Sequence, residues 1–144
     1  MTHSNQLKFR KYQKGRAKGT NTTSQVHFGE FGLKCLQSCR ITEKQLQAAE
    51  VAIKRHVKKM GKLWFRVFCD LPVTSKPIEV RMGKGKGSVD YWACRVQKGK
   101  LLIELSGVSY ELAKKAFSSG ASKLPIATVM VSKPKPKQNH LLHS

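Results

Sequence analysis

Glycine and lysine alternate along residues 80–88, which read VRMGKGKGS. Such a segment does not suit a helix or a central strand, because every second residue lacks a side chain to pack and loses much conformational entropy on ordering. Its glycines can instead let backbone N–H groups approach a phosphate while Lys84 and Lys86 neutralise the charge. The spacing matches neither a Walker loop nor a dinucleotide-binding fingerprint. We predict a projecting loop over 79–88, which is either a phosphate-binding element or a flexible surface loop.

The first 24 residues hold a second group of side chains suited to nucleic acids. Six cationic and two aromatic side chains lie there without any acidic one: Lys8, Arg10, Lys11, Lys14, Arg16 and Lys18, with Phe9 and Tyr12. Aromatic rings can stack on bases while the cations hold phosphates. We interpret residues 1–24 as a basic RNA-contacting arm that is not a folded element, with a solvated tail as the alternative.

The charge of the whole chain agrees with these two segments. Twenty-eight Lys and Arg against eight Asp and Glu leave a net charge of +20 on 144 residues. So much like charge favours a polyanionic partner, above all nucleic acid. No run of about 18 apolar residues is present, so we expect no membrane insertion. The opening residues lack the apolar stretch of a secretory signal and the pattern of a transit peptide.

Catalytic and metal-binding patterns are weak. The eight acidic residues are scattered and form no local carboxylate pair, so we expect no enzyme and no cofactor. Cys35 and Cys39 have three residues between them and no matching second pair, which argues against zinc. We expect all four cysteines, with Cys69 and Cys94, to be free thiols in a reducing compartment. A thiol- or metal-dependent enzyme acting on RNA is one rival hypothesis.

Periodicity predicts the elements that must position the loop and the arm. Thr42 and Gln45 form a capping box that opens a helix of about 19 residues, with Met60 on its apolar stripe and Gly61 at its end. Its exposed face carries cations that either bind phosphate or are simply solvated: Lys44, Lys54, Arg55, Lys58 and Lys59. Because this helix is amphipathic, binding to an anionic membrane surface is a second rival. A second helix is expected after Ser109, and Gly120 is expected to help end it.

The remaining segments indicate strands. One or two short strands with a bend are expected in 25–36, a buried strand over 63–69, a long irregular link over 70–88, a hairpin of 89–96 with 100–105, and a last strand over 126–131. Helices and strands do not alternate strictly. We therefore predict one α+β domain over 25–132, a mainly antiparallel sheet with two helices packed on one side, followed by a basic flexible tail over 133–144.

Several of these segments together resemble a known family. They are KFRKYQKGR (8–16), FGEFGLK (28–34), RITEKQLQAAEVAI (40–53), GKLWFRVFCDLPVTSKP (61–77), EVRMGKGKG (79–87) and KLPI (123–126). In this order and spacing they are similar to ribosomal protein L-sixteen of the large subunit, the universal uL-sixteen family. The resemblance runs from about residue 8 to residue 131.

The resemblance implies a structural protein that binds large-subunit rRNA near the aminoacyl-tRNA site and the peptidyl transferase centre. It would support subunit assembly and the placement of A-site and P-site tRNA, beside neighbouring large-subunit proteins and without homo-oligomers. The arm over 8–18 would bind rRNA, and the tRNA-proximal loop would comprise Arg81, Met82, Gly83, Lys84, Gly85, Lys86 and Gly87.

Residues 70–74 and 79–81, DLPVT and EVR, resemble mitochondrial versions of the family more than plastid ones. The four cysteines and the tail after residue 131 are unlike typical bacterial members. We therefore expect a mitochondrial ribosome, ahead of a plastid or bacterial one. The tail beyond Lys133 has no counterpart in the family.

Overall fold

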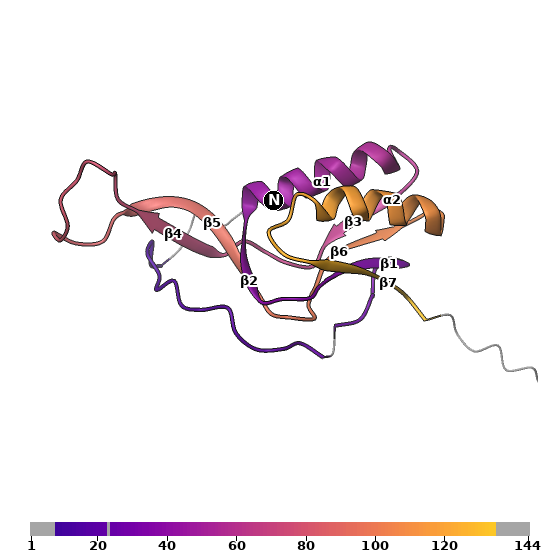
Figure 1. Cartoon of the computed structure of the whole chain (residues 1–144), viewed down its shortest axis with the longest axis horizontal. Helices are drawn as coiled ribbons and strands as arrows, with labels where there is room; N and C mark the ends of the chain where they lie inside the picture. The colour runs from indigo at the N-terminus through magenta and orange to yellow at the C-terminus, as the bar shows by residue number, and fades with distance from the viewer. Residues whose placement is uncertain (1–7, 23, 135–144) are drawn as a thin grey trace, which may run out of the picture.

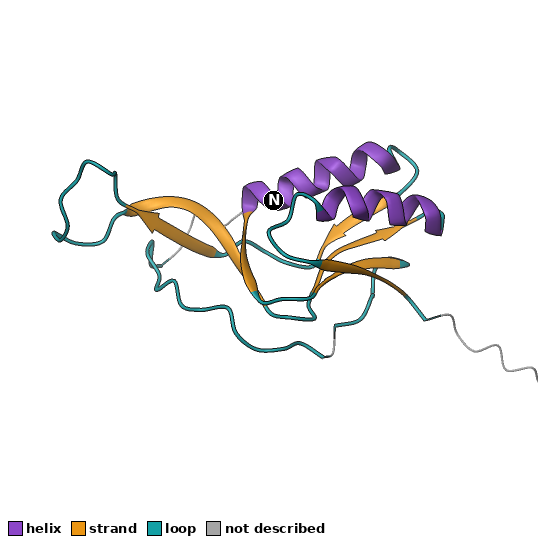
Figure 2. Cartoon of the chain, in the orientation of Figure 1, coloured by secondary structure: helices purple, strands orange, loops and turns teal. Residues whose placement is uncertain are grey.

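The computed structural model describes residues 8–22 and 24–134, so residues 1–7 and 23 of the predicted arm and residues 135–144 of the predicted tail lie outside it. Within the described residues the chain forms the following elements in order: β1 (Phe31–Cys35), β2 (Cys39–Thr42), α1 (Glu43–Val57), β3 (Lys62–Phe65), β4 (Leu71–Ser75), β5 (Ser88–Val96), β6 (Leu101–Ser106), α2 (Tyr110–Ala121) and β7 (Thr128–Ser132). Figure 1 shows their arrangement, and Figure 2 separates helices, strands and loops.

The strands form two sheets. One has four strands in the order β3-β6-β1-β7, and the other has three in the order β2-β5-β4. All named pairs are antiparallel. Both helices lie on the same side of the four-stranded sheet, and the β4–β5 ribbon extends away from them (Figure 1). The predicted α+β class with two helices on one side is confirmed, but the strands divide between two sheets.

The start of α1 follows the prediction. The Thr42 side chain accepts a hydrogen bond from the Gln45 N–H at 3.3 Å, and Gln45 Oε1 accepts one from the Thr42 N–H at 3.0 Å. The predicted end was wrong, because Lys58 takes a positive φ of 54° and stops the helix after Val57. Met60 is consequently 65% exposed instead of lying on the buried stripe.

The second helix also begins at its predicted cap, since Ser109 Oγ accepts a hydrogen bond from the Leu112 N–H. Gly120 does not end this helix but lies buried inside it, against α1. A Cβ on Gly120 would come within 2.7 Å of Ile53 Cγ1, a distance that real contacts do not reach. The missing side chain therefore allows the two helices to approach closely.

The prediction of one or two short strands with a bend in 25–36 is confirmed, because Phe31–Cys35 forms a strand whose pairing with β6 shifts between Leu33 and Lys34. Two neighbouring predictions need correction. The expected buried strand over 63–69 is the partly exposed edge strand β3, and Phe68 lies outside it at 53% exposure. The expected irregular link over 70–88 contains β4, which pairs with β5. Alternation of polar with apolar residues is weak in all three segments, so pairing partners decided their structure.

The predicted hairpin of residues 89–96 with 100–105 is also wrong. Both strands form, as β5 and β6, but β5 pairs with β2 and β4 while β6 pairs with β1 and β3. The turn at Gly99, where φ is 88°, therefore carries the chain from one sheet to the other. Sequence spacing alone does not distinguish this crossing from a hairpin.

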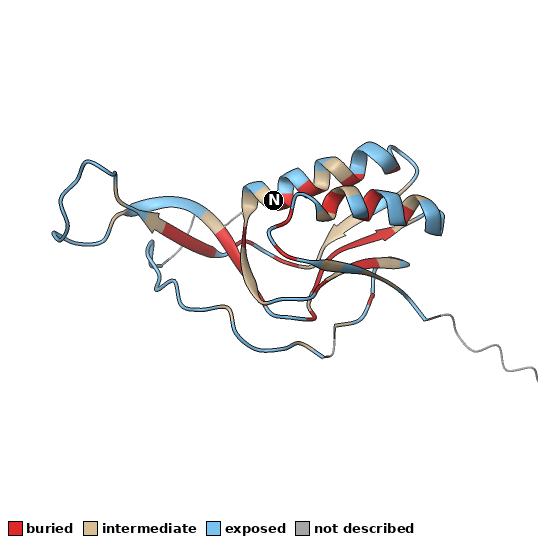
Figure 3. Cartoon of the chain, viewed as in Figure 1, coloured by how far each residue is buried: buried red, intermediate tan, exposed pale blue. Residues whose placement is uncertain are grey.

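The core lies between the helix pair and the sheets (Figure 3). Its largest fully buried side chains include Phe117, Leu46 and Ile53 from the helices and Ile103 and Leu105 from β6. Cys35, Cys69 and Cys94 are buried in the same core, whereas Cys39 is half-buried. This core leaves the loop after β4 and the arm on the outside, where they can meet a partner.

Candidate nucleic-acid interface

The predicted loop is the tip of a two-stranded ribbon. Residues 76–87 join β4 to β5, and Ser75 pairs with Ser88 at the base of the loop. Gly87 is required there, since a Cβ on it would lie 2.3 Å from the Ser75 carbonyl oxygen. The ribbon moves the loop away from the core (Figure 1). The loop thus projects from the end of a strand pair, and it spans residues 76–87 instead of the expected 79–88, because Ser88 belongs to β5 and the β4 strand was not expected.

The outer part of the loop turns through three consecutive residues with positive φ. These are Gly83 at 92°, Lys84 at 58° and Gly85 at 89°. No heavy atom lies within 4 Å of a Cβ added at either glycine, so backbone conformation, and not space, requires glycine there. Lys76 donates a hydrogen bond to the Gly83 carbonyl and ties the turn to the base of the loop. The turn presents Lys84 to solvent.

Loop and arm contact each other through two lysines. Lys11 Nζ donates to the Lys86 carbonyl at 3.0 Å, and Lys86 Nζ donates to the Tyr12 carbonyl. The two bonds run in opposite directions between segments more than 70 residues apart in the chain. Lys86 therefore supports the arm as well as adding charge, a role that the Gly-Lys alternation did not indicate.

The arm continues along β5 on the side of the sheets away from the helices (Figure 1). Gly15 passes beside Arg95, Gly19 beside Gln97, and Asn21 donates its N–H to the Lys98 carbonyl at 2.6 Å. All six predicted arm cations are exposed, and Phe9 is 62% exposed. Over 8–19 the arm forms no helix or strand, yet its path follows the sheet.

The predicted cations at the end of α1 do not join this surface. Lys54 forms an ion pair with Glu50 at 2.6 Å on the helix, while Arg55 is exposed. Lys58 and Lys59 follow the helix instead of lying on its face. The end of α1 lies far from the loop, on the opposite side of the sheets from the arm (Figure 1). The structure thus separates the predicted RNA-binding residues into two surfaces.

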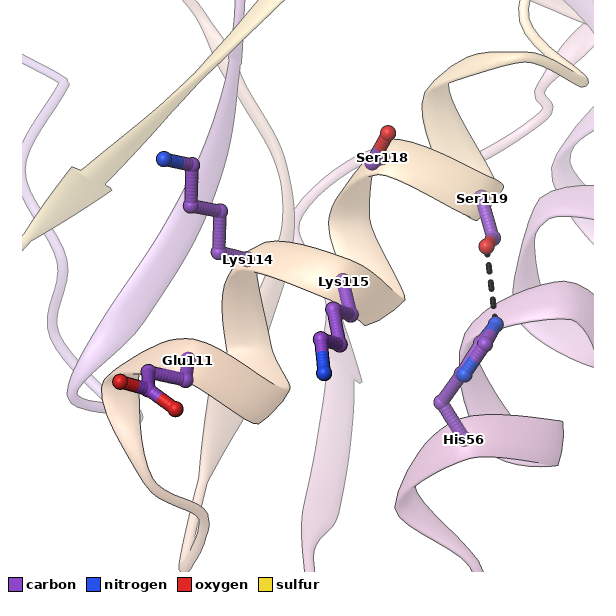
Figure 4. A pocket seen from close by; sticks show the side chains of 6 residues that line it. All are labelled: His56, Glu111, Lys114, Lys115, Ser118 and Ser119. Carbon is purple, nitrogen blue, oxygen red and sulfur yellow. Dashed lines mark hydrogen bonds between the residues drawn. The ribbon is translucent and has the colours of Figure 1, made fainter.

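A shallow groove between the helices adds cations that the sequence analysis did not select. It is lined by residues of both helices: His56, Glu111, Lys114, Lys115, Ser118 and Ser119. His56 Nε2 and Ser119 Oγ share a hydrogen bond of 2.8 Å, which links the two helices, while the Lys114 side chain points away from this bond (Figure 4). The ammonium groups of Lys114 and Lys115 point in different directions and the Glu111 carboxylate opposes an anion, so we assign no phosphate site to this groove.

Another group missed from the sequence lies on the four-stranded sheet. The rings of Phe28 and Trp64 stack with centroids 6.4 Å apart, and the Arg66 guanidinium carbon lies 5.3 Å from the Phe28 ring centroid. We call Phe28, Trp64 and Arg66 the aromatic platform. Its residues come from the segment before β1, from β3 and from the residue after β3, so no local motif could have indicated it.

The platform rests on the buried carboxylate of Glu104. This side chain accepts hydrogen bonds from the N–H groups of His27, Phe28 and Gly29 at 2.7 to 3.2 Å, and it forms an ion pair with Arg66. Burial raises the pKa of the Glu104 carboxyl, but these hydrogen bonds outweigh it and hold the pKa below its ordinary value. Glu104 therefore stays ionised at neutral pH and fixes the segment that carries Phe28.

Among the described residues we also looked for a metal site and for a membrane-spanning helix. They contain no cluster of three or more His, Cys, Asp or Glu side chains that could hold a metal ion. In the same part of the chain, no helix combines the length and apolarity needed to cross a membrane. The geometry supports an extended cationic surface with an aromatic component.

Comparison with known proteins agrees with the extended cationic surface of this small α+β domain. The family model described as ribosomal protein L16p/L10e matches residues 4–131, which is most of the chain. The chain belongs to the ribosomal protein L16p/L10e family. It is therefore a structural protein of the large ribosomal subunit, in a family of structural proteins and not enzymes, with rRNA and ribosomal proteins as its partners.

Proposed function

We propose that the chain binds large-subunit rRNA through its arm and loop near the aminoacyl-tRNA site and the peptidyl transferase centre, where it supports subunit assembly and the placement of A-site and P-site tRNA. The observation that carries this proposal is the pair of lysine bonds between Lys11 and Lys86 and between Lys86 and Tyr12. These bonds hold the arm at the base of the projecting loop. Two cationic segments that are distant in sequence thereby become one continuous surface.

Charge supports the same proposal. The surface combines six exposed arm cations with Arg81, Lys84 and Lys86 of the loop. If about eight phosphates are bound, the slope of log K against log salt should be about −6 to −7, between the single-strand and duplex limits. Filter binding of the full chain to a large-subunit rRNA fragment at several salt concentrations measures this slope. A slope near zero would contradict phosphate-based binding.

Loop and arm should have separable roles. Lys84 lies at the turn of the loop and is exposed, so Lys84→Ala should weaken tRNA placement more than assembly. Removal of residues 1–18 deletes all six arm cations and should mainly impair incorporation into the subunit. Reconstituted subunits, assayed for sedimentation and for tRNA binding, distinguish the two effects. The reverse pattern would contradict the assigned roles.

The ribosome in question is proposed to be mitochondrial. Residues 70–74 and 79–81, together with the four cysteines, support this assignment over a plastid or bacterial ribosome. Fractionation of cells that express a tagged chain, followed by sedimentation of each fraction, tests it. Recovery of the chain in large subunits outside mitochondria would contradict it.

A further inference from the structure

The Phe28 ring of the aromatic platform is largely exposed although it packs against two side chains. Phe28 contacts Trp64 and Arg66, yet 63% of its surface remains accessible. Trp64 is half-buried, and Arg66 leaves 24% of its side chain accessible. Burying more of Phe28 would have been favourable at roughly 25 cal/mol per Å² of apolar surface. The exposed face of the Phe28 ring is therefore accessible to a flat partner, whose binding would bury this apolar surface.

The platform is held rigidly from beneath. Glu104 is fully buried, and Trp64 is its direct partner in the β3–β6 register, so both side chains lie on the same face of the sheet. Leu63 and Phe65 alternate with Trp64 and pack against the core instead. Gly29 lets the chain approach β6, because a Cβ there would lie 2.6 Å from the Leu105 carbonyl oxygen. Phe28 is thus fixed before any partner arrives.

The chemistry of the platform suits one kind of partner. A nucleobase presents a flat π-face that stacks on aromatic rings and on guanidinium planes. Arg66 adds positive charge beside the ring while its own charge is balanced by Glu104. The residue that follows the arm contacts this site, since Arg66 Nη1 donates a hydrogen bond to the Gln25 carbonyl oxygen at 3.5 Å.

We propose that Phe28, Trp64 and Arg66 form a stacking site for an unpaired nucleobase of rRNA, separate from the phosphate contacts of the arm and loop. This proposal rests on the proposed rRNA binding and adds a base-dependent contact to it. Removal of an aromatic side chain on which a base stacks typically weakens the affinity for the nucleic acid about 5- to 150-fold, which corresponds to about 1–3 kcal/mol per base. Because no phosphate contact is involved, the salt slope should not change.

Three proteins test the site. They are the unaltered chain, Phe28→Leu, and the control Tyr110→Leu, which removes a ring of similar exposure (56%) at the start of α2. The probes are a 12-nucleotide oligoadenylate and an abasic 12-mer with the same number of phosphates. We expect Phe28→Leu to bind oligoadenylate about 5- to 150-fold more weakly with an unchanged salt slope, and to bind the abasic probe as the unaltered chain does. Tyr110→Leu should match the unaltered chain on both probes.

Fluorescence gives a second measurement that does not depend on the folding of Phe28→Leu. The chain has two tryptophans, so Trp92→Phe leaves Trp64 as the only indole reporter. Oligoadenylate should quench Trp64 emission, while the abasic probe should not. Absence of quenching, or equal loss of affinity for both probes in Phe28→Leu, would overturn the stacking site.

The outcomes also separate this proposal from the previous one. If Phe28→Leu binds oligoadenylate as tightly as the unaltered chain, the stacking site is refuted while rRNA binding stands. The ring would then be free to contact a neighbouring ribosomal protein. If the unaltered chain binds neither probe, the proposed rRNA binding and the stacking site both fail.

Discussion

The Glu104 carboxylate offers the sharpest test of the physical reasoning. Glu104→Gln keeps the size and shape of the side chain but removes its charge. One amide oxygen can still accept hydrogen bonds from the N–H groups of Phe28 and Gly29. The new NH₂ group faces other donors, namely the Arg66 guanidinium and the His27 N–H. The substitution therefore removes an ion pair and weakens the remaining bonds without creating a cavity.

The size of the effect follows from the number and type of these bonds. A hydrogen bond to a charged group contributes about 1.5–3 kcal/mol, and charge-assisted bonds are roughly twice as strong as neutral ones. Breaking a fully buried ion pair costs about 3–5 kcal/mol, but Arg66 remains 24% exposed and can regain water. Because Arg66 can regain water, the cost should lie at the lower end of the range of about 3–5 kcal/mol. We expect Glu104→Gln to lower the free energy of unfolding by about 3 kcal/mol at pH 7.

Urea unfolding monitored by circular dichroism measures this loss, with Glu79→Gln as the control. Glu79 lies in the exposed loop, so neutralising it should change stability by less than about 0.5 kcal/mol. If Glu104→Gln were also within about 0.5 kcal/mol of the unaltered chain, the inferred role of the buried carboxylate would be wrong. An equal loss of stability in Glu104→Gln and Glu79→Gln would instead show that the change in net charge is the cause.

The stability difference between the unaltered chain and Glu104→Gln should also depend on pH. The Glu104 carboxyl has a lower pKa in the folded protein than its ordinary value of 4.5. Its stabilisation is therefore complete above about pH 4.5 and is lost as the pH falls through the folded-state pKa. The stability difference between the unaltered chain and Glu104→Gln should be constant near neutrality and should shrink below pH 4.5. A difference that grows on acidification would refute the assignment.

Three further predictions concern the helix contact, the arm and the cysteines. Gly120→Ala should lower the free energy of unfolding by up to about 2 kcal/mol, because overpacking against Ile53 costs about 1–3 kcal/mol and the gain in helix propensity returns about 1 kcal/mol. Thermal unfolding measures the change, and an increase in melting temperature would contradict the close helix contact. Lys86→Ala should speed proteolysis within the arm relative to Lys84→Ala, because both remove one charge but only Lys86 bonds the arm; equal rates would contradict this role. In the native chain N-ethylmaleimide should modify half-buried Cys39 before Cys35, where burial raises the pKa of the thiol; mass spectrometry of peptides checks the order, and faster modification of Cys35 would contradict it.

Prediction from sequence succeeded where the signal is local. Both helix starts were predicted, since a cap depends on residues three positions apart, as in Thr42 with Gln45. It failed where a partner in space decided the outcome. Residues 71–75 contain a proline and lack clear alternation, so only their pairing with β5 makes them a strand. The Gly120 error has the same cause, because its role depends on Ile53 of the other helix.

The sequence by itself determined the excess of positive charge, its concentration in an arm and a glycine-rich loop, and the family, because these depend on composition and local order. The tertiary structure alone decided that arm and loop meet through Lys11 and Lys86, and that an aromatic platform stands on Glu104. Glu104 lies 76 residues from Phe28 and 38 from Arg66. Contacts over such separations are set by strand register and packing, which no local pattern encodes.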